Sequence, residues 1–162
     1  MVYKMEQKPY LVYILIILWI VIGILFLGCL ITYTTDYFDQ MESRSDFHFA
    51  SEWDTMMDFS FAISFLLFLF IVVFSFLLVY WIFTRKSWAW LLGIMISSFL
   101  GLYIYSGIQS IGYLIIMDYF DRMFDTAYST FQYVTYFVMI FFVPLLLIIF
   151  TRPQIKTYFG KT

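Results

Sequence analysis

Carboxylates in a repeated phrase are the side chains of this sequence whose types and spacing best suit chemistry. The phrase Asp-Tyr-Phe-Asp-x-Met occupies residues 36–41 and again residues 118–123, each time directly after a long apolar run. Two carboxylates three residues apart share one face of a helix. They predict either an acidic outer mouth that attracts cations or a water-exposed helix end beside an aromatic anchor at the headgroups. The four residues are Asp36, Asp39, Asp118 and Asp121.

Uncharged polar side chains continue into two of the apolar runs. Gln109 lies eight residues before the end of one run at Met117, and Gln132 lies six residues after the start of the next at Thr126. At the rise of an α-helix, both amides would lie ~9–12 Å inside the same end of their helices and could hydrogen-bond each other. The pattern predicts interhelical hydrogen bonds or a polar path for a substrate or ion, and it is continued by Ser106, Ser110, Tyr113 and Tyr136.

Residues that build catalytic or metal centres are scarce. The single His48 has only scattered carboxylates near it in the sequence, such as Asp46 and Glu52, and this is a weak metal pattern beside paired histidines or a Cys-His motif. The lone Cys29 cannot form an intrachain disulfide, and no charged side chain lies within the four apolar runs. We therefore expect no catalytic residue, no metal and no cofactor.

Composition indicates which elements must position these residues. Hydrophobic residues make up 64% of the 162 residues and charged residues only 12%, against roughly 25% charge in a soluble domain. Each of the four runs exceeds the roughly 20 residues with which a helix crosses a bilayer. The predicted fold is an all-α membrane protein, a single integral domain over residues 1–162, with an up-down bundle of transmembrane helices at 10–35, 59–84, 87–117 and 126–151. Residues 36–58 and 118–125 are the predicted outer loops.

Basic residues set the predicted orientation. Seven of the nine lie before the first run, between the second and third runs, or after the fourth, whereas only Arg44 and Arg122 lie in the outer loops. By the positive-inside rule, both termini are cytoplasmic. Ten of the eleven acidic residues lie on the outer side. The expected location is the cell membrane, inner or plasma, which the chain crosses several times.

Small residues and paired phrases predict how the helices associate. Gly93, Ser97 and Gly101 recur every four residues, a pattern that lets two helix backbones approach closely, and the partner helix could belong to this chain or to another subunit. A second paired phrase, Ile-Phe-Thr-Arg at 82–85 and 149–152, follows the first pair in the same order. Together they favour a tandem repeat of two helical hairpins, although a sequence so rich in Phe and Tyr also repeats short phrases by convergence.

The last residues resemble a known group of membrane proteins. The tail PLLLIIFTRPQIKTYFG at residues 144–160 is similar to the C-terminus of small prokaryotic four-helix membrane proteins, whose last span is followed by an Arg-Pro-x-Val/Ile-Lys-x-x-Phe segment. The resemblance covers about a tenth of the chain. It implies a prokaryotic inner membrane and carries no activity, so it assigns no functional residue.

Two functions fit these patterns. The first is a non-enzymatic accessory, interaction or structural subunit, whose partners are the lipid bilayer and either another membrane protein or further copies of the chain, and not nucleic acid. The alternative is a small transporter or channel component for a cation or small polar solute, with the acidic outer mouth at its entrance. Enzymatic activity is the least supported class, because outer carboxylates alone supply neither a nucleophile nor a metal set.

Overall fold

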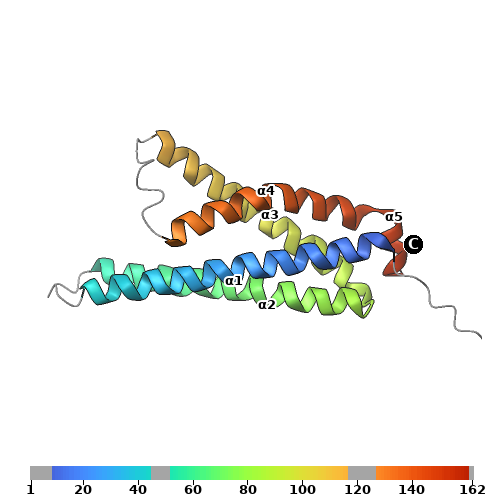
Figure 1. The fold of residues 1–162 in the computed structure, drawn as a ribbon, viewed down its shortest axis with the longest axis horizontal. Coiled ribbons are helices and arrows are strands. Elements are labelled where there is room, and N and C mark those ends of the chain that lie inside the picture. The colour runs from blue at the N-terminus through green and yellow to red at the C-terminus, as the bar shows by residue number, and fades with distance from the viewer. Residues whose placement is uncertain (1–8, 45–51, 117–126, 161–162) are drawn as a thin grey trace, which may run out of the picture.

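Figure 1 shows the fold in a computed structural model, which describes residues 9–44, 52–116 and 127–160. Helices account for every element in these residues, and they are α1 (Tyr10–Arg44), α2 (Glu52–Phe83), α3 (Ser87–Ile116), α4 (Ala127–Thr151) and α5 (Pro153–Tyr158). Four of them contain a segment long and apolar enough to cross a membrane: Tyr10–Asp39, Asp58–Phe83, Ser87–Gly107 and Phe131–Thr151. The prediction of four apolar spanning helices is confirmed, and the four together suggest a multi-pass membrane protein.

The helices form an open bundle. α1 packs along α2 on one side and along α4 on the other, and α3 packs against α4. α2 and α3 follow each other in the chain, yet they contact each other far less than either contacts its other neighbour. The bundle therefore has the order α2, α1, α4, α3, with its open side between α2 and α3.

Buried side chains along α1 show why this helix is central. Leu15, Trp19, Ile22, Phe26 and Cys29 are each at most 1% exposed, and they follow one another in steps of four and three residues. That spacing places them on one stripe of the helix. Because α2 and α4 both pack on α1, this stripe forms the middle of the apolar core.

The two described ends of the chain lie at the same end of the bundle as the turn between α2 and α3 (Figure 1). Here α5 folds across the helix ends, and its Tyr158 hydroxyl donates a hydrogen bond of 3.0 Å to the carbonyl of Ile82. The Arg85 guanidinium lies 4.7 Å above the centre of the Tyr158 ring. Ile155 and Phe159 are buried beside it, so the tail is part of the core rather than an appendage.

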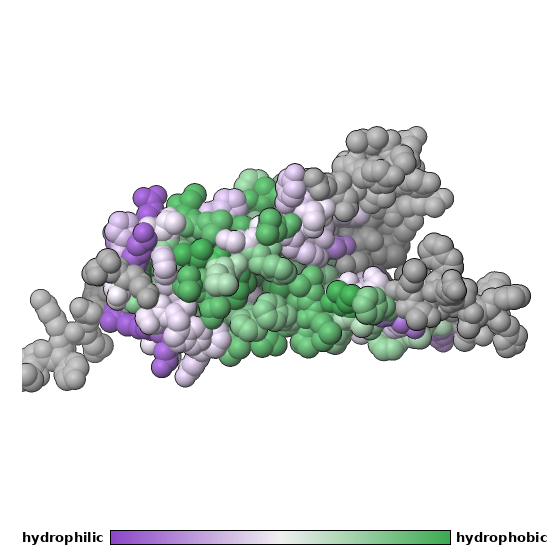
Figure 2. All heavy atoms as spheres, turned by 180° about the vertical axis from the view of Figure 1, so that it is seen from behind, coloured by the Kyte–Doolittle hydropathy of each residue, from purple (hydrophilic) through white to green (hydrophobic). Residues whose placement is uncertain are grey.

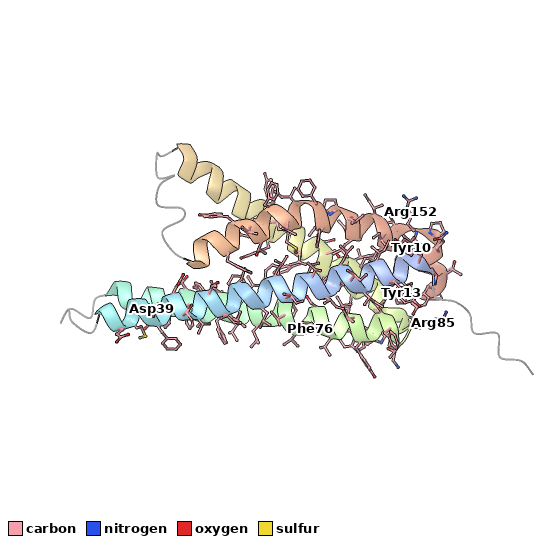
Figure 3. The ribbon with its side chains drawn as sticks, viewed as in Figure 1. Tyr10, Tyr13, Asp39, Phe76, Arg85 and Arg152 are labelled. Atoms are coloured by element: carbon pink, nitrogen blue, oxygen red, sulfur yellow. The ribbon has the colours of Figure 1, made fainter. Side chains whose placement is uncertain are left out.

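Charged residues divide between the two ends of the molecule. Arg85 and Arg152 lie at the end that carries α5, which we call the basic end, and Asp39 lies at the other, which we call the acidic end (Figure 3). Between them the surface is mostly apolar, as Figure 2 shows for one face. An apolar band between polar ends is the surface expected of a protein that spans a bilayer.

Much of the predicted outer loop 36–58 is helical. α1 continues to Arg44, and α2 already begins at Glu52. The Tyr37 ring of α1 stacks on the Phe61 ring of α2 near the ends of the apolar segments Tyr10–Asp39 and Asp58–Phe83, so the two helices are still in contact where they leave these segments. The helical part of the chain therefore extends further at the acidic end than the apolar runs alone predict.

The paired Ile-Phe-Thr-Arg phrases have different surroundings. Ile82 and Ile149 are both buried, but Phe83 is 60% exposed whereas Phe150 is fully buried. The backbone of Arg85 is left-handed, with φ 57°, and that of Arg152 is extended, with φ −64° and ψ 138°. The second Asp-Tyr-Phe-Asp phrase lies outside the described residues. The tandem repeat stays a prediction.

Candidate functional site

Three aromatic rings and one carboxylate join α1 to α2 near the acidic end. The rings of Tyr37 and Phe61 stack with centroids 3.7 Å apart and planes 13° apart. Tyr33, one turn earlier on α1, stacks with the same Phe61 ring at 5.3 Å. The Tyr37 hydroxyl donates a hydrogen bond of 2.7 Å to Oδ1 of Asp58. We call Tyr33, Tyr37, Asp58 and Phe61 the hairpin clamp.

The structure describes half of the predicted acidic mouth. Asp36 is partly buried on α1, and Asp39 is exposed three residues later. Asp118 and Asp121 lie outside the described residues, so the mouth of four carboxylates stays a prediction. Within the described chain, the acidic feature is a helix surface that continues from Asp39 to the exposed Glu42.

The described part of the predicted polar stripe is a short hydrogen-bonded chain. Nε2 of Gln132 donates to the Tyr136 hydroxyl at 2.7 Å, and this hydroxyl donates to the Tyr103 hydroxyl at 3.2 Å. We call Gln132, Tyr136 and Tyr103 the polar chain, and its bond between the two tyrosines links α4 to α3. The exposed Ser106 instead donates to the carbonyl of Tyr103, in its own helix, at 2.8 Å.

The other predicted members of the stripe, Gln109, Ser110 and Tyr113, belong to the helical backbone of α3, and their side chains lie outside the described residues. The predicted bond between Gln109 and Gln132 therefore stays a prediction. Within the described residues, Gln132 bonds a tyrosine of its own helix one turn away.

A glycine makes the contact between Tyr136 and Tyr103 possible. At Gly107, one turn after Tyr103 on α3, a Cβ atom would lie 2.6 Å from the Tyr136 ring. Only a residue without a side chain lets that ring lie so close to α3. Neither Tyr103 nor Gly107 was predicted to belong to the polar stripe, although their four-residue spacing places both on one helix face.

Aromatic contacts connect the polar chain to the hairpin clamp. The Tyr103 ring lies 6.1 Å from that of Phe26 on α1 and 6.4 Å, edge-on, from that of Phe68 on α2. Phe68 in turn meets Tyr33 of the clamp at 5.8 Å. Edge-on and tilted ring pairs at these distances are attractive. These rings of α1, α2 and α3 therefore form one connected row. The contact between Tyr103 and Tyr136 extends the row to α4, so that it includes side chains from all four long helices.

Small polar side chains in the core are satisfied by their own helices. Ser75, Ser97 and Thr135 donate to carbonyls four residues earlier, at 2.7, 2.6 and 2.9 Å. The Cys29 sulfur lies 3.4 Å from the Thr135 hydroxyl. Trp19 is the exception among the described residues, because its buried Nε1 has no hydrogen-bond partner. The described core therefore has few polar atoms left to line a solute path.

Gly93, Ser97 and Gly101 lie against α4 of the same chain. A Cβ atom at Gly93 would overlap the ring of Phe150, and one at Gly101 would lie 3.4 Å from Val143. Ser97, between them, is fully buried. Gly93 faces Phe150, and Gly107 faces Tyr136. The two glycines of α3 are as far apart in the sequence as the two aromatic residues of α4, so the antiparallel helices keep one register between these contacts. In the monomer, α4 occupies this surface of α3.

Few described residues could perform chemistry. Among the residues that the structure describes, no group of three or more His, Cys, Asp and Glu side chains could hold a metal ion. The carboxylates there belong to the acidic end, and the buried hydroxyls are used in helix contacts.

Fold and site together define the class of this chain as a multi-pass helical membrane protein with an open bundle. No protein-family model matches the chain, and neither a curated protein nor a solved structure matches it.

Proposed function

We propose that the protein is a non-enzymatic subunit of a membrane assembly and acts by contacting another membrane protein. We assign this contact to the part of the α1–α2 hairpin at the acidic end. The observation that carries the proposal is the hairpin clamp, because it fixes two helix ends that bear exposed carboxylates.

The lengths of the two helices support a projecting hairpin. α1 has 35 residues and α2 has 32. At the rise of an α-helix each is roughly 50 Å long, against about 30 Å for the hydrocarbon core. At the basic end, the tight turn at Arg85 and the charged side chain of Lys86 keep the helices near the headgroups. The apolar segments reach Asp39 in α1 and begin at Asp58 in α2, so the helical residues beyond them, up to Arg44 and from Glu52, project at the acidic end.

The projecting surface of α1 combines charge with apolar area. Asp39 and Glu42 are exposed, and Phe38 and Met41, each directly before one of them in the sequence, are 59% and 43% exposed. Exposed apolar side chains beside carboxylates favour a protein contact, in which aromatic and Met residues bury area and charge selects the partner. The matching partner surface would carry Lys or Arg around an apolar centre.

We further infer that the basic end faces the cytoplasm and that the membrane is the inner or plasma membrane. The support is the distribution of Lys and Arg, most of which lie in the two termini and the turn between α2 and α3. Basic residues in short loops are retained on the cytoplasmic side. The proposed contact is then made on the outer side of the membrane.

Extraction from native membranes tests the proposal. The tagged full chain is purified in mild detergent with and without Asp39→Asn and Glu42→Gln, two changes that remove charge and keep shape. We expect wild type to carry a partner chain in a fixed ratio and the double variant to lose most of it. Arg152→Gln, a charge change at the opposite end, is the matched control and should keep the partner.

Two results would contradict this proposal. One is a wild-type protein that leaves the membrane as a monomer without a partner, even after cross-linking in intact cells. The other is a partner that the double variant and Arg152→Gln retain equally, because the contact would then lie elsewhere.

The polar chain from Gln132 through Tyr136 to Tyr103 favours a second candidate, transport of a cation or small polar solute. Polar groups within membrane helices often mark such paths. Reconstituted vesicles separate the two functions: a transporter would lose solute flux with Gln109→Leu and Gln132→Leu, whereas a contact subunit would carry no specific flux in either form.

A further inference from the structure

We propose that the groove between α2 and α3 binds an anionic phospholipid, with one acyl chain in the groove and the phosphate beside the basic turn at Arg85 and Lys86. This site lies at the end opposite to the proposed protein contact and does not depend on it.

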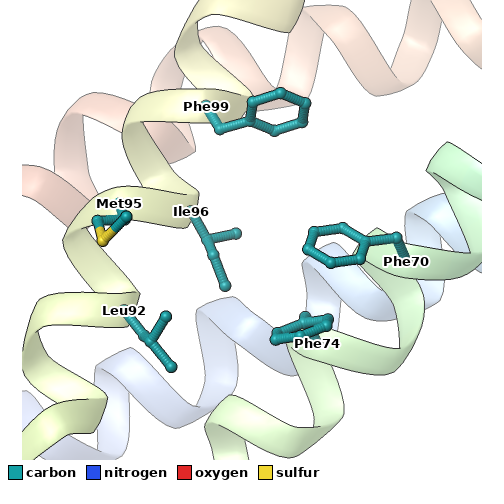
Figure 4. Close-up of a pocket in the computed structure, with 6 residues that line it drawn as sticks. All are labelled: Phe70, Phe74, Leu92, Met95, Ile96 and Phe99. Atoms are coloured by element: carbon teal, nitrogen blue, oxygen red, sulfur yellow. The ribbon is translucent and has the colours of Figure 1, made fainter.

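The groove is a lateral pocket of about 380 Å³ on the open side of the bundle (Figure 4). Phe70 and Phe74 of α2 face the α3 side chains across it. Its volume falls in the range of small-molecule sites, roughly 300–1,000 Å³. Because every lining side chain is apolar, the groove suits a hydrocarbon chain; those of α3 are Leu92, Met95, Ile96 and Phe99.

Aromatic rings continue one wall of the groove as far as the basic turn. The rings of Phe70 and Phe74 lie 4.2 Å apart, and Phe74 meets Trp81 at 6.4 Å. Trp81 then meets Trp88 of α3 edge-on at 4.1 Å. Tryptophan favours the headgroup level of a membrane, so this pair marks the place where an acyl chain would join its headgroup.

The groove lies at the depth that the lower part of an acyl chain reaches in a bilayer. Leu92 lies six residues after Lys86, and Phe99 lies thirteen after it. At the rise of an α-helix, the α3 side chains lie ~9–20 Å below the turn, and Phe74 and Phe70 of α2 lie ~18–24 Å below it, so the pocket reaches the middle of the bilayer, about 15 Å into the hydrocarbon core. A lipid whose phosphate lies at the turn would therefore place its chain beside these side chains.

The charge at the mouth of the groove selects an anionic headgroup. Arg85 and Lys86 are both exposed at the turn, and the described carboxylates lie at the opposite end of the molecule. The left-handed backbone of Arg85, with φ 57°, makes the turn short, so Lys86 lies directly before the first residue of α3, whereas the Arg85 guanidinium lies against the Tyr158 ring. Basic pockets between membrane helices bind anionic lipid headgroups in this way.

The convergence of α2 and α3 favours a lipid chain over a partner helix. Only Thr84, Arg85 and Lys86 separate the two helices, so the groove narrows toward the basic turn. A helix with side chains is about 10–12 Å wide and could not follow the groove to its end. An acyl chain can do so, and it would cover the exposed faces of Met95 and Phe99.

Native mass spectrometry tests the site in the full chain. The protein is reconstituted in vesicles with equal amounts of phosphatidylglycerol and phosphatidylcholine of identical acyl chains, and the lipids retained after transfer to mild detergent are counted. Each basic side chain near a membrane surface contributes about fivefold in affinity for an anionic lipid. We expect wild type to prefer phosphatidylglycerol and Lys86→Gln to lower that preference severalfold.

Matched variants separate this site from general attraction to a basic surface. Lys156→Gln removes an exposed charge from α5 at the same end and should leave the preference unchanged. Ile96→Phe fills the groove and should lower retention of phosphatidylglycerol severalfold, whereas Leu91→Phe, on the 54% exposed outer face of α3, should not. If Ile96→Phe does not fold, Met95→Trp fills the groove from its exposed rim.

Each remaining outcome overturns the proposal. Equal retention of the two lipids by wild type removes the headgroup selectivity. An equal loss with Lys86→Gln and Lys156→Gln reduces it to a surface charge effect. Full retention by the folded groove-filling variants shows that no acyl chain lies between α2 and α3.

Discussion

The Tyr158 hydroxyl donates a hydrogen bond of 3.0 Å to the carbonyl of Ile82, and this bond joins the last helix to the end of α2 across 76 residues. The Ile82 carbonyl also accepts a hydrogen bond of 3.2 Å from the backbone N–H of Arg85, so Tyr158 is a second donor to one of the last carbonyls of the helix. Arg85, which follows in the turn, covers the same ring with its guanidinium. The tail thus fixes the turn between α2 and α3.

Replacing Tyr158 with Phe should destabilise this end of the protein. The change removes one buried hydrogen bond and keeps the ring, so we expect a loss of about 1 kcal/mol in the free energy of unfolding. Thermal unfolding in detergent, followed by circular dichroism, measures it. Tyr80→Phe, at a ring that is 60% exposed, is the matched control and should change little. Equal effects of the two changes would contradict a role for this bond.

The same tyrosine predicts a loss of stability at high pH. Burial raises the pKa of Tyr158 above its ordinary value of 10.0, and the nearby Arg85 only partly opposes this effect. Folding therefore favours the neutral phenol, and its contribution is complete below pH 10 and is lost as the pH rises through the higher folded-state value. The stability difference between wild type and Tyr158→Phe should be constant from pH 7 to 10 and shrink above it. A difference that grows above pH 10 would show the opposite shift.

Sequence patterns were sufficient for the coarse fold, because membrane spans depend on run length and on the lack of charge. They did not determine which helices are neighbours. Gly93, Ser97 and Gly101 indicated close packing, but α4 was identified as the partner only through Phe150 and Val143, which lie far away in the sequence. A stripe of small residues has the same pattern whichever helix covers it.

The tail and the hairpin clamp show a second limit of the sequence. Ile155 and Phe159 are one turn apart in a short segment that follows the last span. The segment is too short for its periodicity to distinguish a buried helix from one that contacts the headgroups. Tyr37 lies between two aspartates in the sequence, yet its hydroxyl donates a hydrogen bond to Asp58 of the next helix. Contacts between elements depend on register, which local patterns do not contain.

Adding a methyl group at Gly93 should be more costly than adding one at Gly101. The Cβ of Gly93→Ala would overlap the fully buried Phe150 ring, so the ring or the helix must move. Overpacking of this kind costs about 1–3 kcal/mol. In Gly101→Ala the new atom would lie at an ordinary 3.4 Å from Val143 and should be close to neutral. Unfolding midpoints of the two variants test the packing of α3 on α4, and equal midpoints would contradict it.

The polar chain predicts a graded series of variants. Tyr136→Phe removes both hydrogen bonds of its hydroxyl, whereas Gln132→Leu and Tyr103→Phe each remove one. The bond from Tyr136 to Tyr103 joins two helices, and such bonds within a membrane contribute about 0.6 kcal/mol; we expect a similar value for the bond from Gln132 within α4. Tyr136→Phe should therefore lower the free energy of unfolding by about the sum of the other two. If Tyr136→Phe has the smallest effect, the hydroxyl does not link α3 to α4.

The hairpin clamp predicts that Tyr37 and Asp58 act as a pair. Both lie near the acidic end, where water competes for the hydrogen bond, so a coupling of about 0.5–1 kcal/mol is expected rather than the larger value of a fully buried bond. A double-mutant cycle with Tyr37→Phe and Asp58→Ala, each of which removes one partner of the bond, measures that coupling directly. Phe61→Leu removes the stacking partner of Tyr37 at 3.7 Å and should reduce the coupling, because the phenol is then no longer held toward the carboxylate. The same cycle with Asp39→Ala in place of Asp58→Ala is the control, and a coupling there as large as with Asp58 would mean that the clamp does not join α1 to α2.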